Sequence, residues 1–442
     1  MQRTEALRNF GWGVVDGGWA VSIAFPALLG AAVMCLGLTV ATQDAAAQEV
    51  RVGVSRATFV LPRQIPLAGY SRRKGASSHG VHDPVGVRAL VLHDADSTPA
   101  LISCDILIVD ERLFDAVRAR LLEHRVPEEL VLMLAATHTH SGPGGYGTKF
   151  FEKLSMGHYD PRVFDALVDT ITRAILTAYH ATAPARVVVR SAATRELIRN
   201  RMDPARGTDN ELTVCAFYPA GAQEPIAVIV NFAAHPTTLG ADNRQLSADY
   251  PGVIVRELER RFPSATCLFV AGAVGDQAPV KHGEGFEAAE WLGRTLTEQA
   301  VVLLRGATPQ PPRLLSAVQE QLPLPPARVR MGRWTLPRWL GAKFVDDDAT
   351  LSLIAVGDVL FLGVPCDLAA SLGQSLKQTA RLKGWQPMVV GFASDYIGYC
   401  LPASLYEEPS YESSLAFNGP ATGELLVQRL AEMIRQAVVS GQ

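Results

Sequence analysis

The residues with the clearest chemical potential in this chain are histidines that directly follow apolar runs. His138 and His140 stand two residues apart after the apolar run at 130–136. His235 follows the apolar run at 226–234. Imidazole nitrogens and carboxylates are common protein ligands of zinc, and a catalytic site leaves one coordination position open for water. The pattern therefore predicts a zinc site in which the two histidine segments meet an acidic residue.

Glycines and acidic residues occupy the loops beside these histidines and after other apolar runs. Gly144 and Gly145 follow His140 closely and would let the backbone approach a ligand. Acidic residues stand after three further apolar runs, at Asp276, Asp367 and Asp395. An acid from one of these loops would complete a set of zinc ligands. Asp276 has a simpler alternative role as the cap of the turn that follows it.

Strands and helices must bring these loops together. Short apolar runs predict strands at 89–93, 130–135, 226–232, 267–271 and 388–392, and a hairpin at 351–362 around a Gly357-Asp358 turn. Apolar residues at helical spacing predict helices at 110–124, 161–180, 284–305 and 421–439. This alternation predicts an α/β fold in which mixed β-sheets are flanked by helices. Loops beyond strand ends carry the chemistry of such folds, so we expect the active site there.

Composition excludes several functional classes. The chain has 442 residues, of which 48% are hydrophobic and 19% charged, and its 41 basic and 44 acidic residues give a net charge of −3. Disordered chains need low hydrophobicity and high net charge. Nucleic-acid binders usually carry a basic excess, so we expect no nucleic-acid partner. A single long apolar run also argues against a polytopic membrane protein.

Residues 1–47 are predicted to be an export signal. Arg3 and Arg8 precede an apolar run at 19–41, and alanines at 45–47 follow it. A basic start, an apolar stretch and small residues before the cleavage point are typical of a signal peptide, here cleaved after Ala47. The run is also long enough for an uncleaved N-terminal anchor. Both interpretations predict an exported body that is periplasmic or secreted.

The body at 48–442 is predicted to be a single domain with one Pro-rich arm near 308–343. This segment reads as a surface arm, or alternatively as a lid or a membrane-facing loop that presents Trp334 and Trp339. A membrane-facing loop would add a peripheral membrane contact. Five cysteines fall in the body at wide spacings without a CxxC pair, which indicates small core residues rather than a disulfide framework. The sequence does not indicate an oligomeric state.

Motifs for other hydrolytic mechanisms are mostly missing. The chain contains no GxSxG, HExxH or GxxxxGK[ST] motif. One SxxK motif runs from Ser71 to Lys74, and the segment at 281–283 loosely resembles its usual KTG partner. These matches raise a serine acyl-enzyme as an alternative, with Ser71 as the nucleophile.

The segments at strand ends resemble the catalytic domain of neutral (alkaline, non-lysosomal) ceramidases. The resemblance extends over about 52–432, and its most specific part, 137–145, is nearly letter for letter the family's signature. Supporting segments occur in the family's order at 200–201, 231–236, 275–279, 395–399 and 411–412. The resemblance implies hydrolysis of the amide of an N-acyl sphingoid base, and hence a lipid-like substrate. The family's C-terminal β-domain has no counterpart after the last predicted helix.

The resemblance also implies the zinc ligands. His138 and His235 match the family's zinc-binding histidines, and Tyr399 matches a tyrosine that reaches the zinc. The family's third ligand is a Glu in a Pro-Gly-Glu turn, which here reads Pro365-Cys366-Asp367. Aspartate ligates zinc as glutamate does, but its side chain is one methylene shorter, so the backbone must lie closer.

The remaining matches concern catalysis and substrate binding. His140 and Arg201 match polar residues that orient the amide, and Tyr411 matches a tyrosine near the developing oxyanion. Ala278 stands where the family has its nucleophilic serine, in the loop that Asp276 begins. Alanine cannot form an acyl intermediate. We therefore expect a zinc-activated water, its pKa lowered towards about 7. His140 would then move the proton, and Arg201 and Tyr411 would stabilise the oxyanion.

Two alternatives remain open. The first alternative to a ceramidase is a catalytically inactive relative that binds lipid, which Ala278 suggests. The second is a zinc hydrolase of a non-sphingolipid amide or ester. An amide and an ester require the same polarised carbonyl and water, so the sequence does not separate them.

Overall fold

A computed structural model describes residues 49–331, 334–342 and 344–439. The predicted export signal at 1–47 lies outside these residues. Residues 46–442 form a compact unit by themselves, and within the described part of the chain the buried core begins at Val50. Among the described helices, none combines the length and the apolar character needed to cross a membrane.

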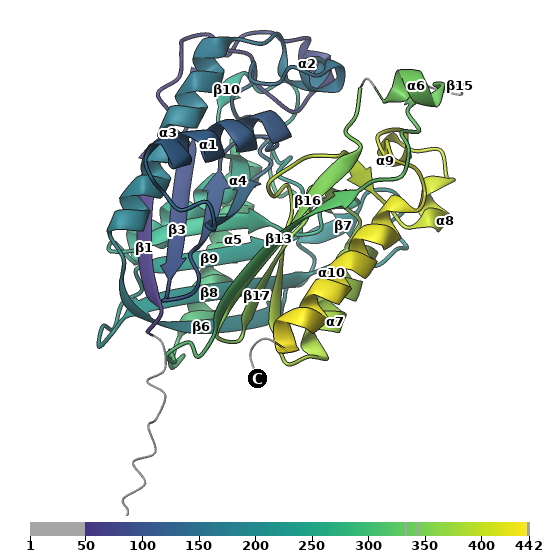
Figure 1. The fold of residues 1–442 in the computed structure, drawn as a ribbon. Helices are drawn as coiled ribbons and strands as arrows, with labels where there is room; N and C mark the ends of the chain where they lie inside the picture. The colour runs from purple at the N-terminus through teal and green to yellow at the C-terminus, as the bar shows by residue number, and fades with distance from the viewer. Residues whose placement is uncertain (1–48, 332–333, 343, 440–442) are drawn as a thin grey trace, which may run out of the picture. The chain divides into compact units, whose positions relative to one another are not determined.

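The first sheet has eight strands in the order β11-β9-β8-β6-β1-β3-β4-β5 (Figure 1). Their bounds are β1 Arg51–Thr58, β3 Gly86–His93, β4 Pro99–Cys104, β5 Val131–Ala136, β6 Ala183–Ala193, β8 Glu211–Pro219, β9 Ala227–Phe232 and β11 Thr266–Ala271. Only β4–β5 and β9–β11 pair in parallel, so the sheet is mixed. Its two halves join through a short pairing of β1 with β6. Ser103 Oγ on β4 donates to the carbonyl of Phe269 on β11 over 2.6 Å, so the halves also contact each other directly.

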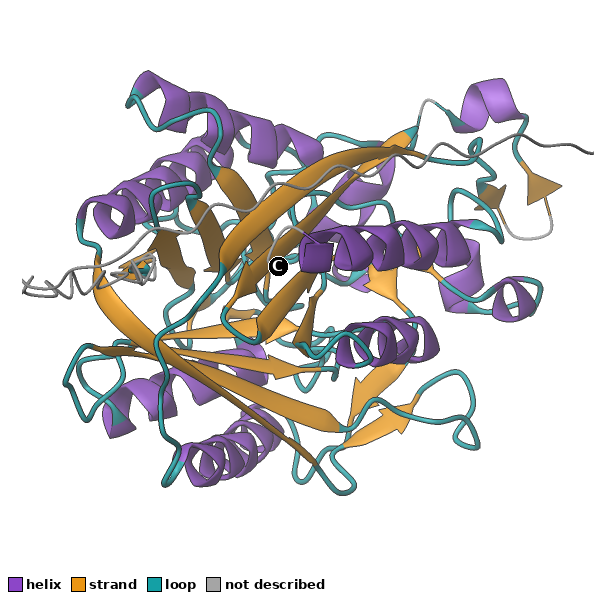
Figure 2. Ribbon diagram, turned by 60° about the horizontal axis from the view of Figure 1, so that its bottom comes forward, coloured by secondary structure: helices purple, strands orange, loops and turns teal. Residues whose placement is uncertain are grey.

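The second sheet has the order β13-β16-β17-β19, with bounds Leu315–Pro323, Asp348–Val356, Val359–Gly363 and Gln386–Val390. One of its faces packs on the first sheet through a core that includes Phe217, Phe361 and Met388. The other face packs on α7 (Ala370–Arg381) and α10 (Thr422–Val439) (Figure 2). The predicted hairpin at 351–362 is confirmed, because β16 and β17 pair across Gly357 and Asp358.

Helices cover the outer faces of the first sheet. The helix α3 (Pro161–His180) packs on β1 and β3 beside α1 (Glu111–Glu123). It begins with Pro161 after an Asp160 N-cap, and its apolar side is buried, as the spacing predicts. On the other half of the sheet, α4 (Asp249–Arg261) packs on β11 and α5 (Phe286–Leu304) on β8. The α/β fold with mixed sheets flanked by helices is confirmed.

Short elements carry the loops between these layers. They are η1 (Ser71–Arg73), β2 (Gly80–Val81), α2 (Phe150–Met156), β7 (Ile198–Asn200), β10 (Gln245–Leu246), β12 (Gln277–Pro279), β14 (Arg330–Met331), β15 (Trp334–Thr335), α6 (Arg338–Gly341), β18 (Asp367–Leu368), β20 (Tyr399–Cys400), α8 (Ala403–Tyr406) and α9 (Tyr411–Ser414). The five cysteines of the body are buried and unpaired, in agreement with their interpretation as core residues.

The Pro-rich segment at 308–343 differs from a simple surface arm. Residues Leu315–Pro323 form β13, which pairs with β16 along its whole length. The prolines at 311, 312 and 323 fall before the strand or at its last residue, where a missing backbone N–H costs no central ladder bond. Only the part that follows β13 projects as an arm, with β14, β15 and α6 (Figure 1).

A buried ion pair fixes α7, the helix that begins just after Asp367. Lys377 Nζ lies 2.7 Å from a carboxylate oxygen of Asp209 and 3.7 Å from Glu211. Lys377 and Asp209 are both buried. Removing one partner of such a pair leaves an uncompensated buried charge.

We therefore predict that Lys377→Ala lowers the free energy of unfolding by about 3–5 kcal/mol. The exposed neighbour Lys383 provides the control, and Lys383→Ala should change the free energy of unfolding by less than about 0.5 kcal/mol. Urea unfolding followed by circular dichroism measures both values. A loss below about 1 kcal/mol for Lys377→Ala would show that the pair does not hold the helix.

Candidate metal centre

His138 lies in the turn that follows β5, with its backbone in the left-handed region at φ 63°. Its backbone N–H donates to the carbonyl of Ile106. The Phe392 ring stacks on the imidazole with a centroid distance of 3.7 Å and an interplanar angle of 3°. Backbone strain of this kind persists only where the surroundings enforce it. The turn and the stacked ring together fix the direction of the His138 side chain.

Backbone carbonyls determine which ring nitrogens carry hydrogen. His138 Nδ1 lies 2.6 Å from the carbonyl oxygen of Leu107, and His235 Nδ1 lies 3.3 Å from that of Val274. A carbonyl oxygen only accepts, so in each neutral ring the hydrogen is on Nδ1 and the lone pair on Nε2. This arrangement is typical of metal-binding histidines, whose second nitrogen donates to a backbone carbonyl.

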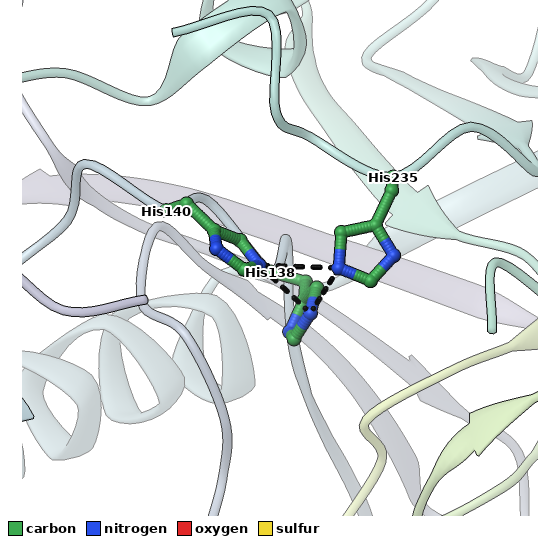
Figure 3. Close-up of side chains that lie close together, drawn as sticks. All are labelled: His138, His140 and His235. Atoms are coloured by element: carbon green, nitrogen blue, oxygen red, sulfur yellow. Dashed lines mark hydrogen bonds between the residues drawn. The ribbon is translucent and has the colours of Figure 1, made fainter. Parts of the chain in front are cut away.

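Three imidazole nitrogens converge on one point (Figure 3). The Nε2 atoms of His138 and His235 are 3.0 Å apart, and His140 Nε2 lies 3.2 Å from the first and 3.1 Å from the second. Zinc–nitrogen bonds of about 2.0–2.1 Å in a tetrahedron separate neighbouring ligand atoms by about 3.3 Å. The three buried histidines therefore lie close enough together to bind a metal ion.

Burial keeps these imidazoles neutral. It lowers the pKa of His138 to about 3, and the Arg201 charge acts in the same direction. Burial, the neighbouring rings and Arg201 lower the pKa of His140 and of His235 well below the ordinary value. A metal binds only deprotonated imidazole, so the site needs no proton release at neutral pH.

The predicted carboxylate, Asp367, lies beside the imidazoles of His138 and His235. Its Oδ1 is 3.7 Å from His138 Nε2 and has no hydrogen-bond partner among the described residues. Its Oδ2 accepts a hydrogen bond of 2.8 Å from the Tyr396 hydroxyl. Burial raises the Asp367 pKa to about 7. A buried, unpartnered oxygen next to three nitrogen lone pairs fits a cation, and this donor set suits zinc.

Arg201 and Tyr399 extend this site on the Asp367 side. The strands β18 and β20 pair in parallel, which places Tyr399 opposite Asp367. An Arg201 Nη donates to the Tyr399 hydroxyl over 2.7 Å, and Arg201 Nε lies 2.8 Å from a Glu412 carboxylate oxygen. Burial raises the Tyr399 pKa well above its ordinary value, so the phenol keeps its proton. Tyr411 lies next to it, with a ring distance of 5.9 Å.

A cavity of about 170 Å³ opens from this cluster to the surface. His138, His140 and Asp367 line it, together with Tyr399 and Tyr411. Its other walls are mainly apolar and include Leu107, Ile108, Phe151, Leu154, Phe344 and Phe417. The ion pair of Lys149 with Asp346 crosses this wall. The site therefore combines a polar end with an apolar channel.

Two predicted site residues hold the backbone instead of facing the cavity. Asp276 accepts from the backbone N–H of Ala370 over 2.8 Å and from Asn200 Nδ2 over 2.9 Å. Its carboxylate thereby caps the start of α7, a helix far along the chain, and not the turn that directly follows it. Ala278 lies in β12, opposite Arg199 of β7. Neither residue is among the described residues that line the cavity.

The chain packs closely against the glycines after His140. A Cβ atom on Gly144 would lie 2.4 Å from the Met156 carbonyl oxygen, and Gly145 has φ 82° and packs near Pro66. The close approach of another part of the chain therefore accounts for glycine at these positions, and their contact with a ligand stays a prediction. The structure does not bring together the residues of the serine alternative. Ser71 lines the cavity, but Lys281, the lysine of the loose KTG match, donates to the Thr238 carbonyl and does not line the described cavity.

Three residues that support the site were not predicted. Phe392 stacks on His138 and Tyr396 donates to Asp367, both from the loop after β19. Arg73 is buried and donates to four carbonyls, at Ala68, His140, Gly240 and Ala241. The only sequence signal was proximity: Tyr396 lies in the 395–399 segment and Arg73 inside the SxxK motif.

The neutral state of His138 predicts a pH dependence of stability in the metal-free protein. The unfolded chain protonates this ring at a pKa of about 6.5, whereas the folded chain does so only near 3. Between these two pKa values the unfolded state therefore binds more protons than the folded state. The free energy of unfolding then decreases by about 1.4 kcal/mol for each unit by which the pH is lowered. Between pH 7 and 4.5, His138→Gln should lose about 3 kcal/mol less than wild type. Urea unfolding in the presence of a chelator measures the difference, and equal losses would contradict a neutral His138.

Arg73 predicts a second effect, on metal affinity. A lysine ammonium cannot reach four carbonyls with the planar fork of a guanidinium. We expect Arg73→Lys to displace the His140 backbone and to weaken zinc binding about 10–100-fold, as loss of supporting contacts does in other zinc sites. Competition with a chromophoric chelator measures the affinity. The exposed neighbour Arg72→Lys is the control, and an Arg73→Lys affinity within about twofold of wild type would refute this positioning role.

Comparisons with known proteins agree with this architecture. The neutral ceramidase of Pseudomonas aeruginosa is 30% identical over 205 residues, which cover 43% of this chain and 30% of the relative. The match thus spans about a third of that relative's length. The crystal structure of neutral ceramidase from Pseudomonas aeruginosa shares the fold with a TM-score of 0.80 at 22% identity, over 89% of this chain and 75% of that chain. A ceramidase described as complexed with C2 gives a TM-score of 0.78 at 21% identity, over 88% and 75%.

A family model described as "Neutral/alkaline non-lysosomal ceramidase, N-terminal" matches residues 51–290. This range includes the three histidines of the cluster and Arg201, whereas Asp367, Tyr399 and Tyr411 lie beyond it. Since the match covers more than half of the chain, the chain belongs to the neutral/alkaline non-lysosomal ceramidase family.

Proposed function

We propose that this chain is a zinc-dependent amidohydrolase of the neutral-ceramidase type. Its substrate would be the amide of an N-acyl sphingoid base or a related acyl amide or ester. The observation that carries the proposal is the convergence of three neutral imidazole nitrogens, next to the unpartnered Asp367 oxygen, at the polar end of an apolar-walled cavity. Family membership supports the same activity.

The ligands of the metal would be His138, His235 and Asp367, with His140 and Tyr399 adjacent. When bound, a divalent metal supplies Lewis acidity, which polarises a carbonyl and lowers the pKa of a water molecule. This chain's own residues prepare the surroundings. The carbonyls of Leu107 and Val274 hold the two rings in the tautomer that presents Nε2.

Arg201 and the tyrosines would stabilise negative charge that develops on the carbonyl oxygen. Glu412 holds the guanidinium in place. The Tyr399 hydroxyl accepts from Arg201, so its own proton remains available for an oxygen in the cavity. Burial raises the pKa of Tyr399 well above its ordinary value, and a tyrosine ordinarily titrates near 10, so both phenols are donors at neutral pH. Fixed donors of this kind lower the barrier because they need no reorganisation during the reaction.

The reaction would use water instead of a serine. Ala278 has no hydroxyl, and it does not line the described cavity. The Ser155 hydroxyl on the cavity wall donates to carbonyls of its own helix. We propose that water attacks the carbonyl carbon and that the C–N bond breaks, with a proton passing to the leaving amine. His140 is the candidate to move that proton, unless it serves as a third imidazole ligand.

The apolar walls support a lipid-like substrate. Phe151, Leu154, Phe344 and Phe417 present hydrocarbon surface along the path from the cluster to the mouth. Such surface gains free energy when it covers an acyl chain. One solved structure of similar fold is described as complexed with C2, and the curated relative is a neutral ceramidase.

The proposal predicts zinc-dependent release of fatty acid from a short-chain N-acylsphingosine by residues 48–442, detected by mass spectrometry. Release should fall to the uncatalysed level after chelation and in the His138→Ala/His235→Ala variant, because no other described cluster offers three such ligands. The His124→Ala/His158→Ala variant, which removes two exposed imidazoles, is the matched control. Full activity in the His138→Ala/His235→Ala variant would refute the metal mechanism.

The His140→Gln variant separates the two roles of that residue. Loss of bound zinc would identify a ligand. Retained zinc with lost turnover would identify the group that moves the proton.

A catalytically inactive lipid-binding relative is the second candidate, and Ala278 favours it. It would bind zinc and the acyl amide without releasing fatty acid. We also propose that the chain is exported, to the periplasm or beyond the cell. The basic start, the apolar run and the alanines of residues 1–47 support export.

A further inference from the structure

Exposed apolar side chains gather around the mouth of the cavity. Among the described residues, ten large hydrophobic side chains are exposed, and five of them form what we call the mouth surface. These five are Phe150 at 52% exposure, Leu154 at 53%, Trp334 at 69%, Trp339 at 70% and Tyr411 at 62%. A scattered exposed leucine needs no explanation, but apolar residues that gather at one place indicate an interaction site.

Contacts connect four of these residues to the cavity, and the fifth, Trp334, stands in β15, which lies beside α6 (Figure 1). Leu154 and Tyr411 line it themselves. The Phe150 ring lies 5.7 Å from that of Phe344, which also lines it. The backbone N–H of Phe344 donates to the Gly341 carbonyl at the end of α6, the helix that carries Trp339. In Figure 1, α2 and α6 lie at the same upper end of the molecule, on either side of a gap.

Basic side chains surround these apolar residues. Lys153 on α2 and Arg338 on α6 are exposed. Arg72 and Lys74, at the end of η1, are exposed beside α2, on which η1 packs. Of the nearby acidic groups, Glu408 is paired with Arg206, and Glu407 lies 3.8 Å from Arg330. Arg72 lies 4.0 Å from Asp242, and Asp347, three residues after Phe344, is an exposed acid. With these acids counted, the border still carries an excess of cations through Lys153, Arg338 and Lys74, which anionic headgroups would attract.

We propose that the mouth surface binds the interface of a lipid bilayer that contains anionic lipids. Tryptophan favours this interface because its ring is apolar and its N–H is polar. Exposed basic groups add attraction to anionic headgroups. The orientation places the cavity mouth against the bilayer, so a lipid amide passes into the cavity without crossing water. This last consequence rests on the proposed function, whereas the binding itself does not.

The test uses residues 48–442, which contain the complete described core but not the apolar run at 19–41, which would itself bind lipid. Co-sedimentation with phosphatidylcholine vesicles, with and without about 30% phosphatidylglycerol, measures binding. Wild type should bind the anionic vesicles more strongly. The Trp334→Ser/Trp339→Ser variant should bind them about tenfold more weakly. The control, Val302→Ser/Leu382→Ser, removes two equally exposed apolar residues outside the mouth surface and should bind like wild type.

A split in activity gives a second readout. With a soluble short-chain N-acylsphingosine, the tryptophan variant should keep kcat/KM within about twofold of wild type. With a long-chain amide embedded in anionic vesicles, its rate should fall about tenfold. Equal vesicle binding by the variant and wild type would overturn the proposal, as would an equal loss in the control. A wild-type dimer seen by light scattering without vesicle binding would overturn it in favour of a second copy of this chain. Absence of all hydrolysis would count against the proposed function and leave vesicle binding to decide this proposal.

Discussion

The lone pairs of His138 Nε2 and His235 Nε2, which face each other over 3.0 Å with His140 Nε2 within 3.2 Å of both, are the constraint on which this structure depends. Without a cation between them such an arrangement is unfavourable, since neutral imidazoles that already donate through Nδ1 have no hydrogen to share at Nε2. The protein must hold the rings in place by other contacts. It does so with the carbonyls of Leu107 and Val274 and with the stacked Phe392 ring.

The arrangement of the two sheets follows from this need. The turns after β5 and β9 of the first sheet supply the histidines, whereas β18 and β20, which follow the second sheet's strands, supply Asp367 and Tyr399. The site therefore forms only where the two sheets pack together. Lys377 of α7 pairs with Asp209 just before β8 and lies 3.7 Å from Glu211 at its start, which ties the Asp367 segment to the first sheet. A buried network of this kind fixes one arrangement of the chain and makes the loss of any one partner costly.

Burial acts on the acids and bases of the site in opposite directions. It lowers the pKa of His138 to about 3 and raises that of Asp367 to about 7. Both shifts favour the neutral form of the group, as expected where no metal charge is present. A bound cation would reverse the effect on the carboxylate and leave the imidazoles as they are.

The sequence predicted much of this fold, because apolar runs and helical spacing are local signals. The helices at α1 and α3 and the β16–β17 hairpin were found in this way. It also indicated His138 and His235, whose positions after strands are visible in the chain. Roles that depend on tertiary contacts were not visible. The sequence suggested Asp276 and Gly144 as site residues, but Asp276 accepts from the Ala370 backbone N–H and Gly144 packs against the Met156 carbonyl. The contacts of Tyr396 with Asp367 and of Arg73 with the His140 carbonyl gave no signal of their own in the sequence. The strand β13 was hidden by the prolines around it.

The most direct test of the central claim is a crystal structure of the zinc-loaded protein with diffraction data on both sides of the zinc absorption edge. The account predicts one anomalous peak within zinc-bonding distance of His138 Nε2 and His235 Nε2, on the side where Asp367 Oδ1 lies. The absence of a peak there, or a peak only at another group of residues, would contradict it.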